Sequence, residues 1–378
     1  MPFTRHNRRT VEIESLEEFD AHIVHTDSLA GWFIQSVDLT DRRPALDKVQ
    51  VAGAVFLGCA MDEATETSLR ARGALLFPRL DGLPFDPYRS RLYDAAELFG
   101  SADGTGLDYA TSTDAEIYAW TREHTHPAGV ADTLAMALHD HAITDALEGW
   151  ELESRRVVGV MGGHALQRGT EQYADAARLG VGLAAAGKTV LTGGGPGAME
   201  AANLGAWFGN HPELLDDALA ELASVPSFRP DIGAWAAVAL RVREWVTDPV
   251  PTIGIPTWFY GHEPPNVFPT GIAKYFANAI REDTLLYRAR GGIVYLPGAA
   301  GTTQEIFQAV TGNYYAADSA LIAPLVLVGR EQWTEILPAW PLLRALAQGR
   351  PMEDHIHLVD TIDEALDVLL LEGRPDAG

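Results

Sequence analysis

Short runs of β-branched and apolar residues alternate with helical spacing of apolar residues through the second part of the chain. This alternation is typical of βαβ units, which build a parallel sheet. Most of the runs are apolar at consecutive positions, as expected for strands that helices cover on both faces. The pattern predicts a Rossmann-like, doubly wound α/β fold. The six expected strands are 156–162, 188–194, 251–257, 292–298, 324–330 and 355–360.

An unusually long gap, residues 199–250, separates the second expected strand from the third. It contains two helical patterns, PELLDDALAELA and DIGAWAAVALRVREWV, which predict an insertion or an extended helical hairpin. Its tryptophans, Trp207, Trp235 and Trp245, are expected to be packing or subunit-interface residues and not ligand-stacking ones. Aromatic side chains serve most often in cores and interfaces.

Before residue 150 the predicted strands come first and the predicted helices follow, so the regular alternation of the second part is absent. Three apolar runs, WFIQSVDLT, VAGAVFLGCAM and ALLFPRL, predict strands, and two helical patterns follow a loop rich in Gly, Asp and Ser at 99–112. We therefore expect a smaller α/β accessory domain at residues 1–150. A short linker, ELESRR, would lead into a Rossmann-like nucleotide-binding catalytic domain at 151–378.

Composition narrows the classes of partner. The 378 residues suit two domains, and the formal net charge of −24 disfavours nucleic-acid polymers and anionic membranes, while it still allows a small anionic ligand in a locally positive pocket. The single cysteine, Cys59, lies in an apolar run expected to be a buried strand and cannot form an intramolecular disulfide, so we expect a cytoplasmic protein. We expect neither a secretory signal nor a membrane span.

Two glycine turns match each other in placement: LTGGGPGAME (191–200) and LPGAAGTTQE (296–305) each leave a strand and enter a helix. In an open parallel sheet both turns lie at the carboxyl edge, where ligands bind. Helix amino termini offer free N–H groups and partial positive charge, so the pair favours an anionic ligand. The alternative is that the glycines only make tight turns. The first strand-to-helix turn adds Gly162, Gly163 and His164 at the same edge.

Three other motifs carry less weight. NAD binding is disfavoured because the first strand is followed by MGGHAL and not by GxGxxG. The P-loop pattern GLAAAGKT (182–189) follows a helix and precedes a strand, so we interpret it as a chance match in which Gly187 ends the helix. The residues HDH at 139–141 point to different helix faces, and we expect no metal site there.

Glu305 is the strongest single catalytic candidate, since it lies about one turn inside the helix that begins near Gly301. The alternative is an ordinary acid that the helix dipole favours. Upstream, residues 271–290 predict a helix with Arg281 in its middle. This arginine is either a surface residue or a fixed cation beside an anionic substrate, and the pattern alone does not choose.

The motifs GGGPGAME and PGAAGTTQE resemble the paired signature of the Lonely Guy (LOG) family of phosphoribohydrolases, often mislabelled as lysine decarboxylases. The stretches MGGHALQRGTEQY and EPPN (263–266) are more similar still to the larger bacterial nucleotide 5′-monophosphate nucleosidases. The resemblance covers roughly residues 151–370. A lysine decarboxylase needs a lysine for pyridoxal, and Lys48, Lys188 and Lys274 do not suit that role.

The resemblance implies hydrolysis of the N-glycosidic bond of nucleoside 5′-monophosphates such as AMP, including cytokinin riboside monophosphates, to free base and ribose 5-phosphate. It implies no metal or other cofactor, and a homodimer or a larger homo-oligomer. Glu305 and Arg281 match the family's catalytic residues. The residues expected to bind the substrate are Gly162, Gly163, His164, Gly193, Gly194, Gly195, Gly197, Met199, Asn266, Gly298, Gly301, Thr302 and Thr303.

The sequence departs from the family at Ala299, where a second glycine is usual, and at Gln304, where an acid is frequent. Alanine at positive φ costs about 1 to 2 kcal/mol, so we expect position 299 to keep a negative φ. The spacing from Arg281 to Pro297 is one residue longer than usual, and we place the extra residue at Gly291 or Gly292, outside the helix. These departures keep a second hypothesis open, a nucleotide sensor that binds without turnover.

Overall fold

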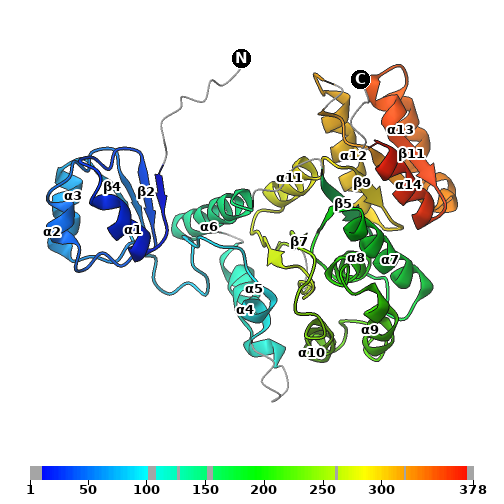
Figure 1. The fold of residues 1–378 in the computed structure, drawn as a ribbon, viewed down its shortest axis with the longest axis horizontal. Coiled ribbons are helices and arrows are strands. Elements are labelled where there is room, and N and C mark those ends of the chain that lie inside the picture. The colour runs from blue at the N-terminus through cyan, green and yellow to red at the C-terminus, as the bar shows by residue number, and fades with distance from the viewer. Residues whose placement is uncertain are drawn as a thin grey trace. The chain divides into compact units, whose positions relative to one another are not determined.

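The computed structural model describes residues 11–100, 108–125, 128–150, 156–259, 263–318 and 321–372 (Figure 1). The chain forms two compact units. The smaller unit contains Met1–Arg91 and Ala128–Ala146, and the larger contains Leu92–Pro127 and Leu147–Gly378. None of the helices in the described ranges combines the length and the hydrophobicity that a membrane-spanning segment requires.

The smaller unit is built on four parallel strands that are neighbours in chain order. They are β1 (Val11–Ile13), β2 (Trp32–Gln35), β3 (Val55–Leu57) and β4 (Leu75–Phe77). The helices of this unit are α1 (Leu16–Ile23), α2 (Arg43–Leu46), α3 (Glu63–Ala71) and most of α6 (Val130–Glu148). Because each strand pairs in parallel with the next along the chain, this part is a short α/β solenoid.

Three glycines mark the repeat of this solenoid. Gly31, Gly53 and Gly73 each precede a strand and have positive φ. The N–H of Gly31 donates to the carbonyl of Gly53, and the N–H of Gly53 donates to the carbonyl of Gly73. The sequence predicts the last three strands but not β1, whose segment VEI contains only two apolar residues. The repeat was not predicted either, because strands of three or four residues give too short a pattern to detect a period. The core between strands and helices includes Cys59, which is buried as expected.

The larger unit contains a parallel sheet of seven strands in the order β11-β10-β9-β5-β6-β7-β8. The strands are β5 (Val157–Met161), β6 (Thr189–Thr192), β7 (Thr252–Gly254), β8 (Gly271–Ile272), β9 (Ile293–Tyr295), β10 (Leu325–Val328) and β11 (Ile356–Val359). All six expected strands are present, and β8 is an addition. The order reverses at β5, which lies between β6 and β9, so the doubly wound α/β fold is confirmed.

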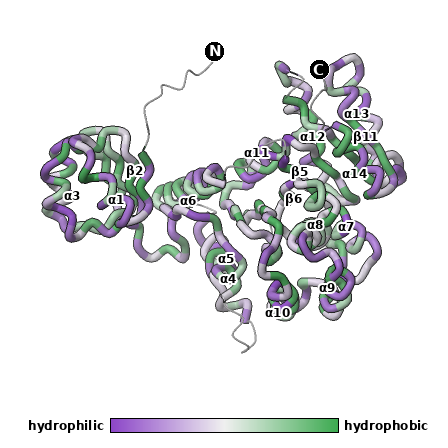
Figure 2. The backbone as a smooth tube through the Cα atoms, in the orientation of Figure 1, coloured by the Kyte–Doolittle hydropathy of each residue, from purple (hydrophilic) through white to green (hydrophobic). Residues whose placement is uncertain are grey.

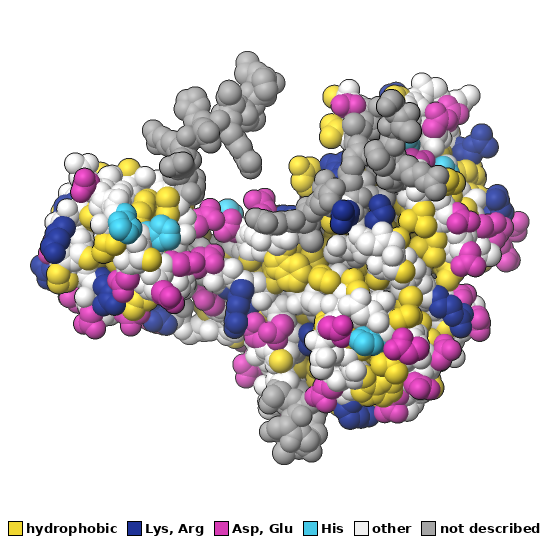
Figure 3. Space-filling view, in the orientation of Figure 1, with side chains coloured by type: hydrophobic (Ala, Val, Ile, Leu, Met, Phe, Trp, Pro, Cys, Tyr) yellow, Lys and Arg dark blue, Asp and Glu magenta, His cyan; other side chains and the backbone are white. Residues whose placement is uncertain are grey.

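Helices on both faces enclose this sheet (Figure 1). Helix α7 (Glu171–Ala185) packs against α8 (Ala198–Trp207) and α14 (Ile362–Glu372), while α12 (Ala300–Tyr314) packs against α11 (Asn278–Arg288) and α13 (Ala339–Ala347). The long gap contains α9 (Leu215–Leu222) and α10 (Ile232–Arg243), as expected. Figure 2 shows hydrophobic stretches at β2 and β11, and Figure 3 shows acidic side chains spread over the visible surface, in line with the net charge.

The division into units differs from a single boundary at residue 150. Helices α4 (Ala95–Phe99) and α5 (Thr113–His124) belong to the larger unit, where Tyr93 forms a β-bridge with Ile272 of β8. Asp114 of α5 accepts a hydrogen bond from the indole N–H of Trp258 at 2.9 Å and pairs with the Lys274 ammonium at 2.5 Å. A buried ammonium needs such a partner, which explains why this segment groups with the larger unit. The linker expected at 151–156 lies outside the described residues except for Arg156.

The predicted helix at 271–290 begins later than expected. Residues 271–272 form β8, and α11 begins only at Asn278. Arg281 therefore lies in the first turn of α11 and not in its middle. The helix ends at Arg288, so Gly291 and Gly292 lie outside it, as expected.

Candidate active site

Glu305 and Arg281 meet at the carboxyl edge of the larger sheet. Nη1 of Arg281 donates to Oε1 of Glu305 at 3.3 Å. Only about a tenth of each side chain is exposed, 12% for Arg281 and 11% for Glu305. The Nε atom of Arg281 is buried and finds no acceptor in the described part of the chain. The structure thus brings together the two residues expected to be catalytic and leaves one buried donor for a ligand.

The environment of Glu305 moves its titration toward neutral pH. Burial raises the pKa of the carboxyl to about 7, because a charged form loses hydration in the interior. The guanidinium of Arg281 acts in the opposite direction, while the nearby carboxylate of Glu282 raises the pKa further. A carboxyl with a pKa near 7 can exchange protons with a substrate or water at physiological pH.

Gln304 has a specific partner across the α11–α12 contact. Its side-chain amide donates to Oε2 of Glu282, and the amide of Asn278 donates to Oε1 of the same carboxylate at 2.7 Å. Glu282 is buried. An acid at position 304 would face this buried carboxylate, whereas a glutamine satisfies it. The departure at Gln304 therefore fits the presence of Glu282 on α11.

Three turns join at this edge. The N–H of Gly163 donates to the carbonyl of Pro297 at 3.1 Å, and the N–H of Ala198 donates to the carbonyl of Gly163 at 3.2 Å. Gly162 and Gly197 lie where the turns touch, since a Cβ at Gly162 would come within 2.7 Å of the Ala198 side chain. The first turn, the triple-glycine turn and the turn before α12 form one contiguous surface, as the sequence predicted.

The triple-glycine turn, Gly193–Gly195, is closed in this structure. Its residues are buried, and the sulfur of Met199 lies 2.8 Å from where a Cβ at Gly193 would be. Asn266 is fully buried beneath the turn: its N–H donates to the carbonyl of Gly194 at 2.8 Å and its amide to that of Gly195 at 3.1 Å. Asn266 thus holds the shape of the turn. The side chain of Met199 lies against Gly193 and Gly195, and methionine is flexible enough to change rotamer there.

The turn before α12 is open. Ala299 has a φ of −121°, so the expected negative φ is confirmed and the loop needs no second glycine. Gly298 packs against the buried Thr302, a Cβ added at Gly301 would meet nothing within 4 Å, and Thr303 bonds to the carbonyl of Ala299. The first N–H groups of α12 have no partner within the helix. Among the turns of this edge, the exposed amino terminus of α12 has the geometry that suits an anion.

A contact between an imidazole and a carboxylate borders the triple-glycine turn. Nδ1 of His164 lies 3.2 Å from Oε1 of Glu263. A Cβ at Gly195 would lie 3.8 Å from Oε2 of Glu263, and one at Gly193 would lie 3.6 Å from Nη1 of Arg281. The carboxylate of Glu263 therefore lies beside the turn, and Glu305 is connected to the turn through Arg281. Glu263 was not singled out from the sequence, although its segment, EPPN, was.

Three further features predicted from the sequence concern Gly187, the tryptophans of the long gap and metal binding. Gly187 has a φ of +69° directly after α7, which confirms its place at the end of the helix and explains the P-loop pattern. Trp207 and Trp235 are buried and lie against Arg243 and Arg168, whereas Trp245 is 41% exposed. Among the described residues, no group of three or more His, Cys, Asp or Glu side chains could hold a metal ion.

Comparisons with known proteins give a family match for part of the chain. The model of the SLOG cluster4 family, in a superfamily that includes LOG-like folds, matches residues 155–210. This segment contains the first turn and the triple-glycine turn but neither Arg281 nor Glu305. No curated protein matches the chain.

Solved structures similar to the chain include two proteins whose names refer to the molybdenum cofactor. One is the molybdenum cofactor binding protein of the phototrophic bacterium Rippkaea orientalis, with 17% identity, a TM-score of 0.34, and coverage of 57% of this chain and 96% of that chain. The other is the molybdenum cofactor carrier protein MCP of Chlamydomonas reinhardtii, with 18% identity, a TM-score of 0.35, and coverage of 57% and 98%.

Proposed function

We propose that this chain hydrolyses the N-glycosidic bond of nucleoside 5′-monophosphates to give free base and ribose 5-phosphate. The observation that carries the proposal is the pair Glu305–Arg281, buried, 3.3 Å apart and next to Gly193 of the triple-glycine turn. The SLOG cluster4 match to residues 155–210 supports a nucleotide-related role. The resemblance of the two glycine turns to the LOG signature supports the choice of reaction.

Electrostatics favours one orientation of the substrate. The phosphate binds at the amino terminus of α12, where free N–H groups of Ala300, Gly301 and Thr302 and the helix dipole attract an anion. Glu263 borders the triple-glycine turn and repels a phosphate from it, while Glu305 lies on the far side of Arg281, which contacts the same turn. The neutral sugar therefore lies between the two carboxylates, with Met199 displaced.

The chemistry follows from this placement. Cleavage of the glycosidic bond builds positive charge on the ribose ring, which the Glu305 carboxylate stabilises, and the same carboxylate can activate the attacking water. Negative charge develops on the departing base, and the guanidinium of Arg281 stabilises it. Phosphate binding holds the sugar in register with Glu305, which lies one helical turn from the anion site.

Incubation of the purified chain with a panel of purine and pyrimidine monophosphates tests the proposal, with chromatography to detect the free base. We expect release of base from at least one nucleotide, and a loss of at least about a hundredfold in Arg281→Gln, since one electrostatic contact to a transition state is worth that much. Asp367→Asn, an exposed change on α14, is the matched control. Binding of these nucleotides without any product contradicts the proposal and favours a nucleotide sensor.

A further inference from the structure

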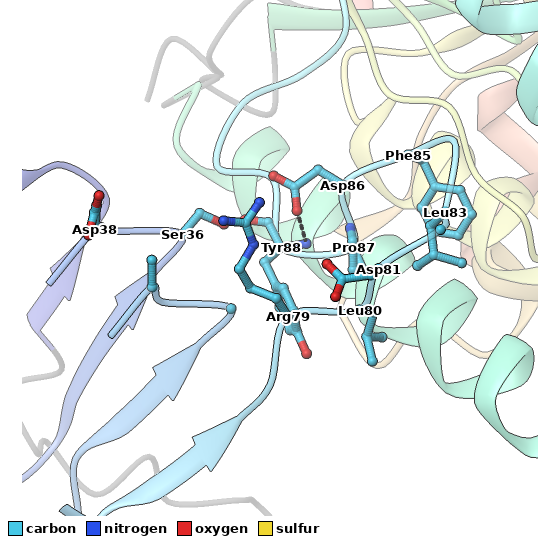
Figure 4. Close-up of a pocket in the computed structure, with 13 residues that line it drawn as sticks. Ser36, Asp38, Arg79, Leu80, Asp81, Leu83, Phe85, Asp86, Pro87 and Tyr88 are labelled. Atoms are coloured by element: carbon cyan, nitrogen blue, oxygen red, sulfur yellow. Dashed lines mark hydrogen bonds between the residues drawn. The ribbon is translucent and has the colours of Figure 1, made fainter. Parts of the chain in front are cut away.

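The smaller unit contains a cavity of about 480 Å³ at the carboxyl ends of β2, β3 and β4 (Figure 4). Ser36 and Asp38 follow β2, Gly58 follows β3, and the segment 79–88 after β4 forms the opposite wall. A volume of this size suits a small organic ligand. Every lining residue belongs to the smaller unit, to which the proposed hydrolysis assigns no role.

The cavity is lined by side chains of both signs, so a ligand that carries one positive and one negative group would complement it. Arg79 projects from the wall and makes no direct hydrogen bond or ion pair within the described ranges, although its charge acts on the carboxylate of Asp38 across the cavity. Three carboxylates, Asp38, Asp81 and Asp86, share the cavity with it. The net charge of these four side chains, −2, attracts an ammonium group, while the guanidinium of Arg79 can bind a carboxylate through two hydrogen bonds.

An apolar region completes the lining. Leu80 and Leu83 line the cavity, and Figure 4 shows Leu83 beside Phe85, at the end away from Ser36 and Asp38. Phe85 is buried and packs edge-on against His139, with ring centroids 5.3 Å apart, so this end is firmly held. A ligand that places charges near Arg79 can bury an apolar side chain here.

The walls of the cavity are fixed to each other before any ligand binds. Ser36 has a φ of +54° and is the one non-glycine residue in the described structure with a positive value. Its Oγ donates to the carbonyl of Tyr88 at 3.1 Å, and the ring of Tyr88 lies directly on Gly58. The amide of Tyr88 in turn donates to Asp86 at 2.9 Å. This arrangement holds a strained strand end against the opposite wall, as is frequent where a ligand binds.

We propose that this cavity binds a free α-amino acid with an apolar side chain. Arg79 holds the α-carboxylate, Asp81 and Asp86 hold the α-ammonium, and the side chain packs on Leu80 and Leu83. The proposal stands independently of the hydrolytic function, since it involves no residue of the larger unit.

Isothermal titration calorimetry of the full chain with L-leucine and L-phenylalanine tests this proposal. We expect one or both to bind, and roughly tenfold or greater weakening for the corresponding amide, which lacks the carboxylate, and for the N-acetyl derivative, which lacks the ammonium. Arg79→Gln and Asp81→Asn should each weaken binding by a similar factor. Arg43→Gln, on α2 of the same unit and outside the cavity, is the matched control and should bind as the wild type does.

Two kinds of result overturn the proposal. One is the absence of heat with either amino acid at millimolar concentration, confirmed by an unchanged melting temperature. The other is binding that survives both Arg79→Gln and Asp81→Asn, or an amide that binds as tightly as the free amino acid. The last outcome would assign the cavity to simple cations.

Discussion

Glu305 gives the sharpest prediction at the scale of single residues, because burial raises the pKa of its carboxyl from 4.5 to about 7. If the carboxylate is the active form, kcat/KM should rise tenfold per pH unit below about 7 and level off above it. A pH–rate profile between pH 5 and 9 checks this. A rate that is flat across this range would show that Glu305 does not titrate in the free enzyme.

The same raised pKa makes the contribution of Glu305 to the free energy of unfolding depend on pH. Because the folded-state pKa lies above the unfolded value, the protonated form stabilises the protein, and this contribution disappears as the pH rises from about 4.5 through about 7. Between pH 5 and pH 8 the wild type should lose about 2 kcal/mol of unfolding free energy relative to Glu305→Gln. Parallel urea titrations at the two pH values measure the difference, and equal slopes with pH would contradict it.

Glu263 should determine the choice between ribose and deoxyribose. The carboxylate of Glu263 repels a phosphate. The vicinal hydroxyls of a ribose, in contrast, can donate two charge-assisted hydrogen bonds to this carboxylate. Removal of the 2′-hydroxyl should therefore lower kcat/KM of the wild type by roughly tenfold or more, and Glu263→Gln should reduce that preference. Paired kinetics with AMP and dAMP measure it. An equal loss with both nucleotides in the variant would limit Glu263 to holding His164.

At the scale of elements, α11 and α12 are connected by a hydrogen bond between the amide of Gln304 and the carboxylate of Glu282, so a donor on one helix needs an acceptor on the other. Gln304→Glu places a carboxylate against Glu282 and should raise the apparent pKa of Glu305 and lower turnover at pH 7. The double change Glu282→Gln with Gln304→Glu restores one acid and one amide, so it should recover much of the loss. A double-mutant cycle at pH 7 measures this coupling. Additive losses would mean that the contact has no influence on the site.

The contact of α7 with α8 depends on glycines that let the helices approach closely. A Cβ at Gly205 would collide with the carbonyl of Ala177, and one at Gly180 with the carbonyl of Ala202. Gly205→Ala should cost at least about 1 to 3 kcal/mol of unfolding free energy. Gly312→Ala on α12 is the matched control: a Cβ there meets nothing within 4 Å, so the change should stabilise the helix by about 0.5 to 1 kcal/mol. Equal effects in denaturant titrations would contradict this account.

At the scale of the whole molecule, each of the two units is built from two stretches that are separated in the sequence. Asp114 and Lys274 are 160 positions apart, yet both are buried and form one ion pair. Asp114→Ala leaves a buried ammonium without its anion and should cost about 3 to 5 kcal/mol. The exposed Glu116→Ala on the same helix should cost under about 0.5 kcal/mol. Thermal unfolding compares the two, and similar melting temperatures would contradict the structural role of this pair.

The sequence predicted what depends on local pattern and missed what depends on distant contacts. Consecutive β-branched residues were sufficient for the six main strands. The pairing of Glu305 with Arg281 was implied by the resemblance to the LOG family, because the residue pattern alone did not decide the role of Arg281. The two-residue strand β8 has no pattern of its own. Three features arise only from tertiary packing: the ion pair of Asp114 with Lys274, the contact of Met199 with Gly193, and the position of Glu263 beside Gly195.

The account depends most on Glu305 as the group that acts on the sugar. The direct test is the rate of ribose 5-phosphate formation from the preferred nucleoside monophosphate by the wild type and by Glu305→Gln, with circular dichroism and nucleotide binding as controls for fold and site. We predict steady release by the wild type and a loss of at least about a hundredfold in the variant, with binding retained. A variant that forms ribose 5-phosphate at the wild-type rate, or a wild type that forms none, would contradict the account.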